Sequence, residues 1–196
     1  MQNIPDFLSS GGKMGALMRA YDWSASALGA HEYWPQPLKT LAAVLLTANQ
    51  PMFIAWGAER TLLYNDAYSE ILGNKHPSAL GCDFLKVWSE IRADLVPIVQ
   101  KAYAGEPVHM DDIELWMERK GHPEETHFAF SYTPVRNELG SVSGFFCPCV
   151  EITQQVLAER RRAGDAEWQL QLFEKAPGFI VILAGPEHVF EFVNAA

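Results

Sequence analysis

The sequence predicts an α+β domain in which five antiparallel strands carry helices on one face. Two short apolar strands separated by a glycine turn come first, and three longer stretches in which apolar and polar residues alternate come last. Segments with helical spacing lie between them. This order of strands, helices and again strands favours a single antiparallel sheet covered by helices.

Residues 1–50 predict a helical arm ahead of this domain. An irregular helical segment over 13–34 carries large apolar side chains that must pack on the domain or on a second copy of the chain. They are Leu17, Met18, Tyr21, Trp23, Leu28, Tyr33 and Trp34. A helix follows over about 37–49, because Pro35 suits a first turn and apolar residues recur at i, i+3, i+4 and i+7.

Residues 51–152 supply the predicted domain. Its opening strands are Met52–Trp56 and Thr61–Tyr64. Helical segments are expected over Asp66–Leu72, 78–91 and about 94–104. The closing strands are Val108–Arg119, Thr126–Val135 and Val142–Val150.

The segment 153–176 predicts an amphipathic linker helix with a heptad-like apolar seam. The seam is interrupted by Glu159 and Gly164, so it is short for an independent coiled coil but suits the pairing of two helices in a homodimer. Its apolar members are Ile152, Val156, Ala166, Leu170 and Phe173.

The opening hairpin of the domain returns near the C-terminus. Residues 51–65 and 177–194 both open with Pro-x-Phe-Ile, pass through an apolar strand and a glycine turn, and reach Asn-x-Ala. We therefore expect 177–196 to be the truncated start of a second domain of the same kind. Repeated modules of this sort are typical of a sensor.

Charge and composition exclude several classes of function. The net charge of −9 argues against a nucleic-acid surface, because phosphate binding needs clustered lysine and arginine. No stretch approaches the ~20 apolar residues of a membrane span, and the N-terminus lacks the features of a signal peptide. Three cysteines do not form a disulfide framework. We expect a cytoplasmic protein with no nucleic-acid partner and no membrane insertion.

The sequence contains little that indicates a catalytic or metal-binding site. No phosphate-binding loop, nucleophile elbow or zinc-protease motif occurs, so we expect no enzyme in this chain. Cys147 and Cys149 share a strand face but have no second pair to complete a zinc site. His122, Glu125 and His127 could cluster at a strand end, but a surface turn is favoured. We therefore expect no metal.

Several strings resemble the PAS family. Residues 133–140 resemble the hairpin between its last two strands, and 64–68 match the Asn-x-Ala element after its second strand. Glu151, Ile152 and Thr153 stand where the family commonly has Asp-Ile-Thr before a signalling helix. The resemblance implies a PAS fold in which these three residues relay a signal.

A more specific resemblance suggests which output domain this domain would control. Trp34-Pro35, Pro51–Gly57, Leu72–Pro77 and Glu124–Phe128 resemble N-terminal sensor segments of bacterial histidine kinases. This implies the input part of such a kinase, with the catalytic core as a downstream domain outside the chain. A cyclic-dinucleotide synthase or a transcription factor would be an alternative output that residues 1–196 do not separate from a kinase.

The resemblance suggests two possible cofactors, haem and flavin, and we expect neither to bind. Haem needs an axial ligand, which such domains take from a histidine on the long helix, and residues 94–104 contain none. Flavin photochemistry needs a reactive cysteine preceded by asparagine and followed by a basic residue. Cys82 lies between Gly81 and Asp83 and lacks both neighbours.

Aromatic residues form the candidate ligand site. They come from strands and helices that face each other in such a domain, and they either fill the core or leave a pocket for a small aromatic or amphipathic ligand. A ligand-free dimerisation module is the alternative; a small-molecule enzyme is disfavoured because no catalytic set is assembled. The candidates are Tyr64, Tyr68, Trp88, Ile98, Trp116, Phe128, Phe130, Tyr132 and Phe145.

Overall fold

The computed structural model describes residues 6–175, 177–178, 180–184, 186 and 189–193. The chain divides into two compact units, Met1–Ile152 and Thr153–Ala196. The first unit contains a five-stranded sheet with its helices, and the second contains a helix followed by a two-stranded hairpin.

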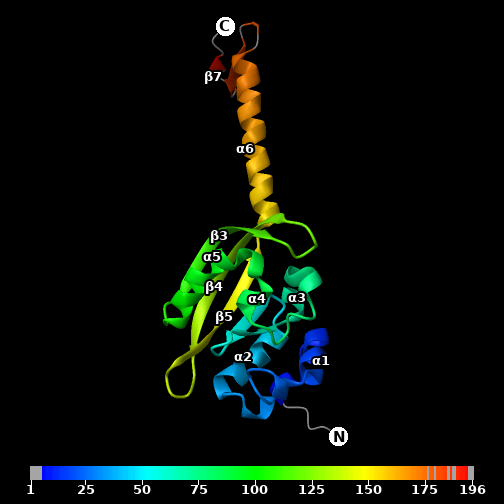
Figure 1. Cartoon of the computed structure of the whole chain (residues 1–196). Coiled ribbons are helices and arrows are strands. Elements are labelled where there is room, and N and C mark those ends of the chain that lie inside the picture. The colour runs from blue at the N-terminus through cyan, green and yellow to red at the C-terminus, as the bar shows by residue number, and fades with distance from the viewer. Residues whose placement is uncertain (1–5, 176, 179, 185, 187–188, 194–196) are drawn as a thin grey trace. The chain divides into compact units, whose positions relative to one another are not determined.

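The sheet of the first unit is antiparallel throughout, with the strand order β2-β1-β5-β4-β3 (Figure 1). This order places the first and last strands of the domain side by side at its centre, with Phe53 opposite Cys147. The predicted α+β architecture, a five-stranded antiparallel sheet with helices on one face, is confirmed. The strands are β1 Met52–Trp56, β2 Thr61–Tyr64, β3 Val108–Met117, β4 Glu124–Arg136 and β5 Val142–Glu151.

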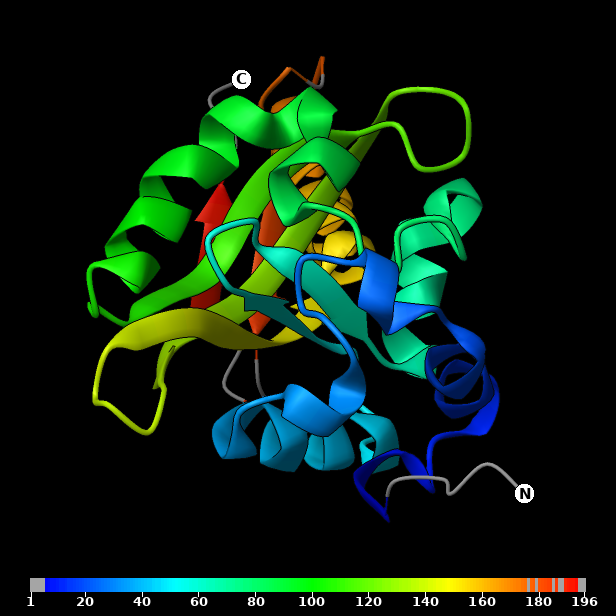
Figure 2. The same ribbon diagram turned by 60° about the horizontal axis from the view of Figure 1, so that its bottom comes forward.

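Helices between β2 and β3 cover one face of this sheet (Figure 2). The first begins where Asn65 caps it, since the Asn65 side chain accepts a hydrogen bond from the backbone N–H of Tyr68 at 3.0 Å. The longest, α5, contacts β3, β4 and β5. The elements are α3 Asp66–Leu72, η4 Gly73–Lys75, α4 Phe84–Val87, η5 Ser89–Ile91 and α5 Arg92–Tyr103.

The N-terminal arm packs on the domain. Leu8, Met14 and Met18 are fully buried in the same core as the sheet. The indole of Trp23 donates to the carbonyl of Met18 at 2.7 Å and meets the ring of Trp34 edge-on at 4.9 Å. The arm is therefore part of the domain's core. Its elements are η1 Asp6–Leu8, α1 Gly12–Ala20, η2 Trp23–Ala25, η3 His31–Tyr33 and α2 Gln36–Thr47.

The second unit begins with α6, Thr153–Glu174, and ends with an antiparallel hairpin of β6, Val181–Ala184, and β7, Val189–Val193. Phe179 and Asn194 of the sequence repeat lie outside the described residues. None of the helices in the described part of the chain combines the length and apolar character that crossing a membrane requires.

Side chains of the predicted seam are described only in part. Ile152 and Val156 are half-buried. The side chains of Ala166, Leu170 and Phe173 lie outside the described residues. Trp168 and Leu172, which the seam does not include, are 62% and 51% exposed.

Candidate functional site

A small cavity lies between the sheet and the helices that cover it. Its volume is about 40 Å³. The lining comes from β1, β3, β4 and β5 on one side and from α3, α4, η5 and α5 on the other. The lining residues are Phe53, Tyr68, Ile71, Phe84, Trp88, Ile91, Leu95, Leu115, Met117, Phe128, Phe130, Tyr132, Cys147 and Cys149.

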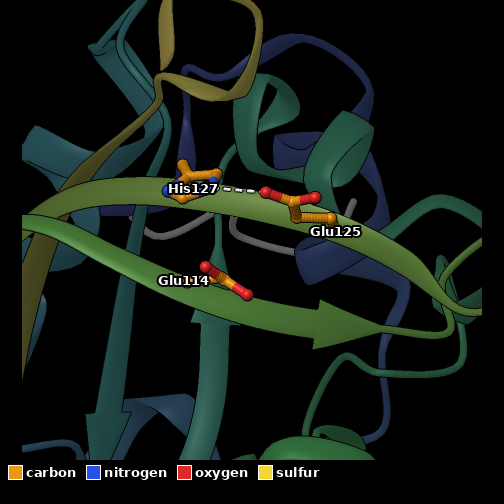
Figure 3. A group of neighbouring side chains, drawn as sticks. All are labelled: Glu114, Glu125 and His127. Carbon is orange, nitrogen blue, oxygen red and sulfur yellow. Dashed lines mark hydrogen bonds and ion pairs between the residues drawn. The ribbon is translucent and has the colours of Figure 1, made fainter. Parts of the chain in front are cut away.

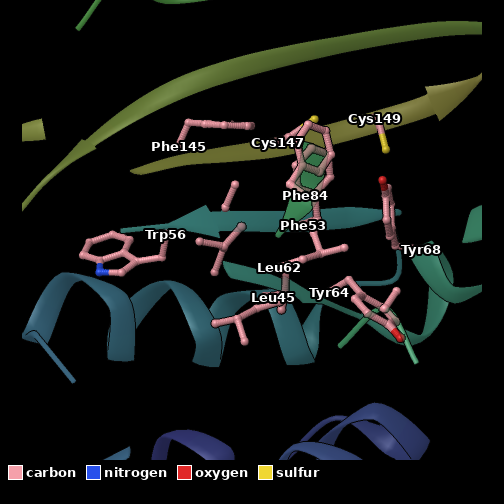
Figure 4. Close-up of a cluster of buried hydrophobic side chains, with 14 of the residues drawn as sticks. Leu45, Phe53, Trp56, Leu62, Tyr64, Tyr68, Phe84, Phe145, Cys147 and Cys149 are labelled. Atoms are coloured by element: carbon pink, nitrogen blue, oxygen red, sulfur yellow. The ribbon is translucent and has the colours of Figure 1, made fainter. Parts of the chain in front are cut away.

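Aromatic rings occupy most of the interior around this cavity (Figure 4). Phe53 stacks on Phe84 with ring centroids 4.8 Å apart, and Tyr132 stacks on Phe145 at 4.3 Å. Such offset ring contacts add to the stabilisation from burial alone. The aromatic cluster predicted from the sequence thus serves mainly as core and leaves a small space.

Part of the predicted pocket lies at the cavity. Tyr68, Trp88, Phe128, Phe130 and Tyr132 line it. They are brought together because alternate residues of β4 face inward and because α3 and the α4–η5 segment deliver Tyr68 and Trp88 from the helical side.

Trp116 was wrongly assigned to the pocket. Its side chain is 56% exposed on the outer face of β3, because the residues on either side of it, Leu115 and Met117, point inward and line the cavity. Successive side chains of a strand point to opposite faces, so all three cannot face the same layer. The alternation in the sequence contained this information.

Tyr64, Ile98 and Phe145 are buried but do not line the cavity. The hydroxyl of Tyr64 lies 2.9 Å from Nδ1 of His76. The ring of Phe145 stacks on the ring of Tyr132, which does line the cavity. The prediction for these three residues is corrected from pocket to core. Residues that line the cavity and residues that pack behind the lining are both buried. Apolar or aromatic character in the sequence therefore does not separate the two groups.

Cys147 and Cys149 are lining residues that the sequence prediction left out. They share one face of β5, the spacing that the sequence showed, and both point into the interior. Figure 4 shows the Tyr68 hydroxyl directed toward the Cys149 thiol. Phe145 lies two residues before Cys147, so the same period-two alternation of β5 places it on this face as well.

Three polar side chains of the cavity, those of Tyr68, Tyr132 and Cys147, are kept neutral by burial. The Tyr68 hydroxyl accepts a hydrogen bond from the indole N–H of Trp88 at 3.1 Å. Burial raises the pKa of Tyr68, of Tyr132 and of Cys147, so none of them ionises near neutral pH. No charged residue is among those that line the cavity. The space therefore suits a small, uncharged, largely apolar molecule.

Flavin and haem do not fit this cavity as it stands. About 40 Å³ is far below the roughly 300–1,000 Å³ of pockets that hold cofactor-sized ligands. Cys82 is exposed, donates its thiol to the carbonyl of Ser78 at 3.1 Å and is not among the lining residues. The expectation that neither cofactor binds stays a prediction.

A buried arginine connects the cavity-lining elements to the end of the sheet. The side chain of Arg119 is 4% exposed. Its guanidinium donates to both carboxylate oxygens of Glu151 at 2.7 and 2.8 Å and to Glu124 at 2.7 Å. It also reaches the carbonyl of Ile71 on α3 at 3.5 Å. Arg119 was not among the residues predicted from the sequence.

The backbone of Arg119 contacts the same helical segment. Its carbonyl accepts from the N–H of Asn74 at 2.8 Å. Gly73 has φ of +54°, and a Cβ there would lie 2.6 Å from this carbonyl oxygen, so glycine is required for the approach. The end of α3 is thereby fixed to the β3–β4 turn through both backbone and side chain.

The predicted relay residues lie in and directly after this network. Glu151, the last residue of β5, pairs with Arg119, and Ile152 donates its N–H to the carbonyl of His127 at 2.8 Å. Thr153 begins α6 and is buried. Burial lowers the pKa of Arg119, but the hydrogen bonds to Glu151 and Glu124 outweigh it and raise that pKa above its ordinary value. The guanidinium stays charged.

Comparison with known proteins identifies the fold. A family model described as "PAS fold" matches residues 48–157, more than half of the chain. None of the curated proteins matches.

Several solved structures are similar to this chain at low sequence identity. An RNA-binding light-oxygen-voltage receptor is 18% identical with a TM-score of 0.49, over 72% of this chain and 40% of its own. A light-oxygen-voltage domain studied with a flavin analogue is 14% identical with a TM-score of 0.46, over 65% and 96%. The PAS domain of Bordetella pertussis BvgS is 19% identical with a TM-score of 0.43, over 66% and 97%. At these values the matches specify no ligand for this chain.

Acid should weaken the network around Arg119. Burial raises the pKa of Glu124, but hydrogen bonds from Arg119 and Lys120 outweigh it and lower that pKa below its ordinary 4.5. The carboxylate therefore stabilises the fold above that value, and this contribution is lost as the pH falls through the lowered pKa, by about 1.4 kcal/mol per unit of lowering. Urea unfolding at a series of pH values should show a shallower loss below about pH 4.5 in Glu124→Gln. The exposed Glu106→Gln should keep the wild-type slope, and equal slopes in all three proteins would contradict the role of Glu124.

Proposed function

Because this chain belongs to the PAS family, we propose that it is a sensory module whose signal enters at the cavity and leaves through the residues after β5. The observation that carries the proposal is the position of Arg119. One guanidinium contacts the carbonyl of Ile71, a residue that lines the cavity, and the carboxylate of Glu151, the last residue of the sheet.

The signal passes through elements that line the cavity and meet at Arg119. A ligand that enters a space of about 40 Å³ must displace some of its lining. Ile71 on α3 and Met117 on β3 are lining residues within a few positions of the contacts to Arg119. A shift of either element therefore changes the geometry of the Arg119–Glu151 pair. Glu151 is followed by Ile152 and Thr153, which begin the path into α6.

The switch requires a ligand that binds one arrangement of this network better than the other. Occupancy without such a difference shifts no equilibrium. The neutral lining selects a small uncharged molecule, and the Tyr68 hydroxyl offers it one hydrogen-bonding group. The chain itself has no catalytic role in this proposal.

The output we propose is a histidine kinase that follows α6 in a longer protein. The support is the likeness of Pro51–Gly57 and the other strings to sensor segments of such kinases. Two α6 helices would pair in a homodimer through the seam from Ile152 to Phe173, and a change at Glu151 would alter their packing. A cyclic-dinucleotide synthase or a transcription factor could take the same input.

A ligand-free interaction module is the second candidate. The observation that favours it is the smallness of the cavity within an otherwise filled aromatic core. Exposed apolar side chains on the outer face of the sheet, Trp116 at 56% and Val150 at 45%, would supply a contact surface.

Xenon separates these candidates, because it is a single apolar atom of a size that suits a small dry cavity. In amide NMR spectra of the whole chain, xenon should shift signals of Tyr68 and Phe128 at the cavity and of Glu151–Thr153 at the junction. Leu95→Phe, which fills the cavity, should abolish both sets of shifts. Glu151→Gln should keep the cavity shifts and reduce those at the junction.

Two results would count against the proposal. If xenon shifts no cavity residue, the interaction module is favoured. If the cavity responds while Glu151–Thr153 stay unchanged in wild type, the relay through Arg119 is wrong although a binding site exists.

The dimer seam has its own test in analytical ultracentrifugation. Leu170→Ser with Phe173→Ser should weaken the dimer at least tenfold, because both positions lie on the predicted seam. Trp168→Ser with Leu172→Ser is the matched control, since the helical period places this pair on the opposite side of α6. A dimer that survives the first pair and dissociates with the second would show that the seam is assigned to the wrong face.

A further inference from the structure

His127 and two carboxylates, Glu114 and Glu125, meet on the outer face of the sheet, away from the cavity (Figure 3). Glu114 lies opposite His127 in the β3–β4 register, and Glu125 precedes His127 by two residues on the same face. A shift of register between Met110 and Ile113 turns Asp112 to this face as well. His127 is 1% exposed although it points outward from the sheet.

Both ring nitrogens of His127 face carboxylates. Nδ1 lies 2.7 Å from an oxygen of Asp112, and Nε2 lies 3.0 Å from an oxygen of Glu125. A neutral imidazole has one N–H donor and one lone pair, and an ionised carboxylate only accepts. Whichever nitrogen holds the proton, the other directs its lone pair at an anionic oxygen. Both contacts are satisfied either by a second proton on the ring or by another cation that takes the place of one proton.

His109, on the same strand as Asp112, provides the contrast. Its Nε2 lies 2.9 Å from a carboxylate oxygen of Asp111, but its Nδ1 lies 2.7 Å from the hydroxyl of Ser131. A hydroxyl can donate to a lone pair. A neutral His109 therefore satisfies both contacts, whereas a neutral His127 has one N–H and cannot donate to both of its carboxylates.

We propose that the cation is a divalent metal of the zinc type, bound by Nε2 of His127 and by carboxylate oxygens of Glu125 and Glu114. The ligand atoms of these three residues lie within 4.8 Å of one another. Glu114 is exposed, so its side chain has room to complete the site. Three protein ligands with a fourth position left to water form a common zinc geometry, and histidine nitrogen and glutamate oxygen are both zinc ligands.

Asp112 has the role of the carboxylate that usually orients a metal-bound histidine. A carboxylate that accepts the N–H of the other ring nitrogen fixes the tautomer and directs the lone pair of the ligating nitrogen at the metal. Asp112 makes this contact at Nδ1. Imidazole with carboxylates favours zinc over magnesium or calcium, which prefer oxygen ligands alone. Any proton on Nε2 is released to solvent when the metal binds.

The sequence had suggested a surface turn for His122, Glu125 and His127, and no metal. His122 is indeed exposed in the turn and is not part of the group. Glu114 and Asp112 take part because β3 pairs with β4, a long-range contact that the local pattern does not contain. This proposal does not depend on a ligand in the cavity.

Zinc titration of the metal-free whole chain tests the site by calorimetry and by metal content after dialysis. Wild type should bind one Zn²⁺, and Glu114→Gln should bind it at least tenfold more weakly while urea unfolding shows an intact fold. Asp112→Asn should weaken binding about 10- to 100-fold through the orientation of His127. His109→Ala, the matched control, should bind as wild type does.

Three results would overturn the proposal. Wild type could fail to bind zinc, binding could be lost in His109→Ala, or it could be unchanged in Glu114→Gln. Nitrogen NMR of the His127 ring distinguishes the proton from the metal. A ring that keeps protons on both nitrogens in the presence of zinc would show that a proton, not a metal, fills the site.

Discussion

The buried guanidinium of Arg119 constrains the arrangement of the whole first unit. A charge that is 4% exposed is tolerated only when opposite charges and hydrogen bonds surround it. Glu124 and Glu151 supply the charges, and the carbonyl of Ile71 adds a further contact. The β3–β4 turn, the end of α3 and the end of β5 must therefore stay together.

In the function that we propose, this constraint lets the junction after β5 respond to the interior. Ile71 and Met117 line the cavity, and Arg119 is two residues beyond Met117. The small cavity would strengthen the proposed coupling, because a well-packed core has little empty space in which to absorb a guest without moving. A filled aromatic interior and a sensory role are thus compatible in one domain.

Local pattern in the sequence was enough for the order of the strands and helices. Period-two alternation in β3 and β4 and the proline and glycine boundaries gave the elements of the sheet. The same alternation would have excluded Trp116 from the pocket, had it outweighed aromatic character. Cys147 and Cys149 were seen to share a face, but which face is inward depends on packing with α3 and α4.

Contacts between distant residues could not be predicted from a single sequence. Arg119 and Glu151 are 32 positions apart, and an arginine at the end of a predicted strand normally indicates an exposed residue. The group around His127 needs the β3–β4 register to bring Glu114 opposite it. The arm was recognised as apolar enough to pack, but its burial against the domain, with Met14 and Met18 fully covered, followed only from the three-dimensional arrangement.

Amide hydrogen exchange of Arg119→Met, compared with wild type, tests most directly whether Arg119 joins the cavity to the junction. The methionine keeps much of the side-chain volume and removes the charge. If Arg119 is the connection, exchange should accelerate both in α3, Asp66–Leu72, and over Glu151–Thr153. Acceleration confined to the turn over residues 118–123, with both of those segments unchanged, would contradict the account.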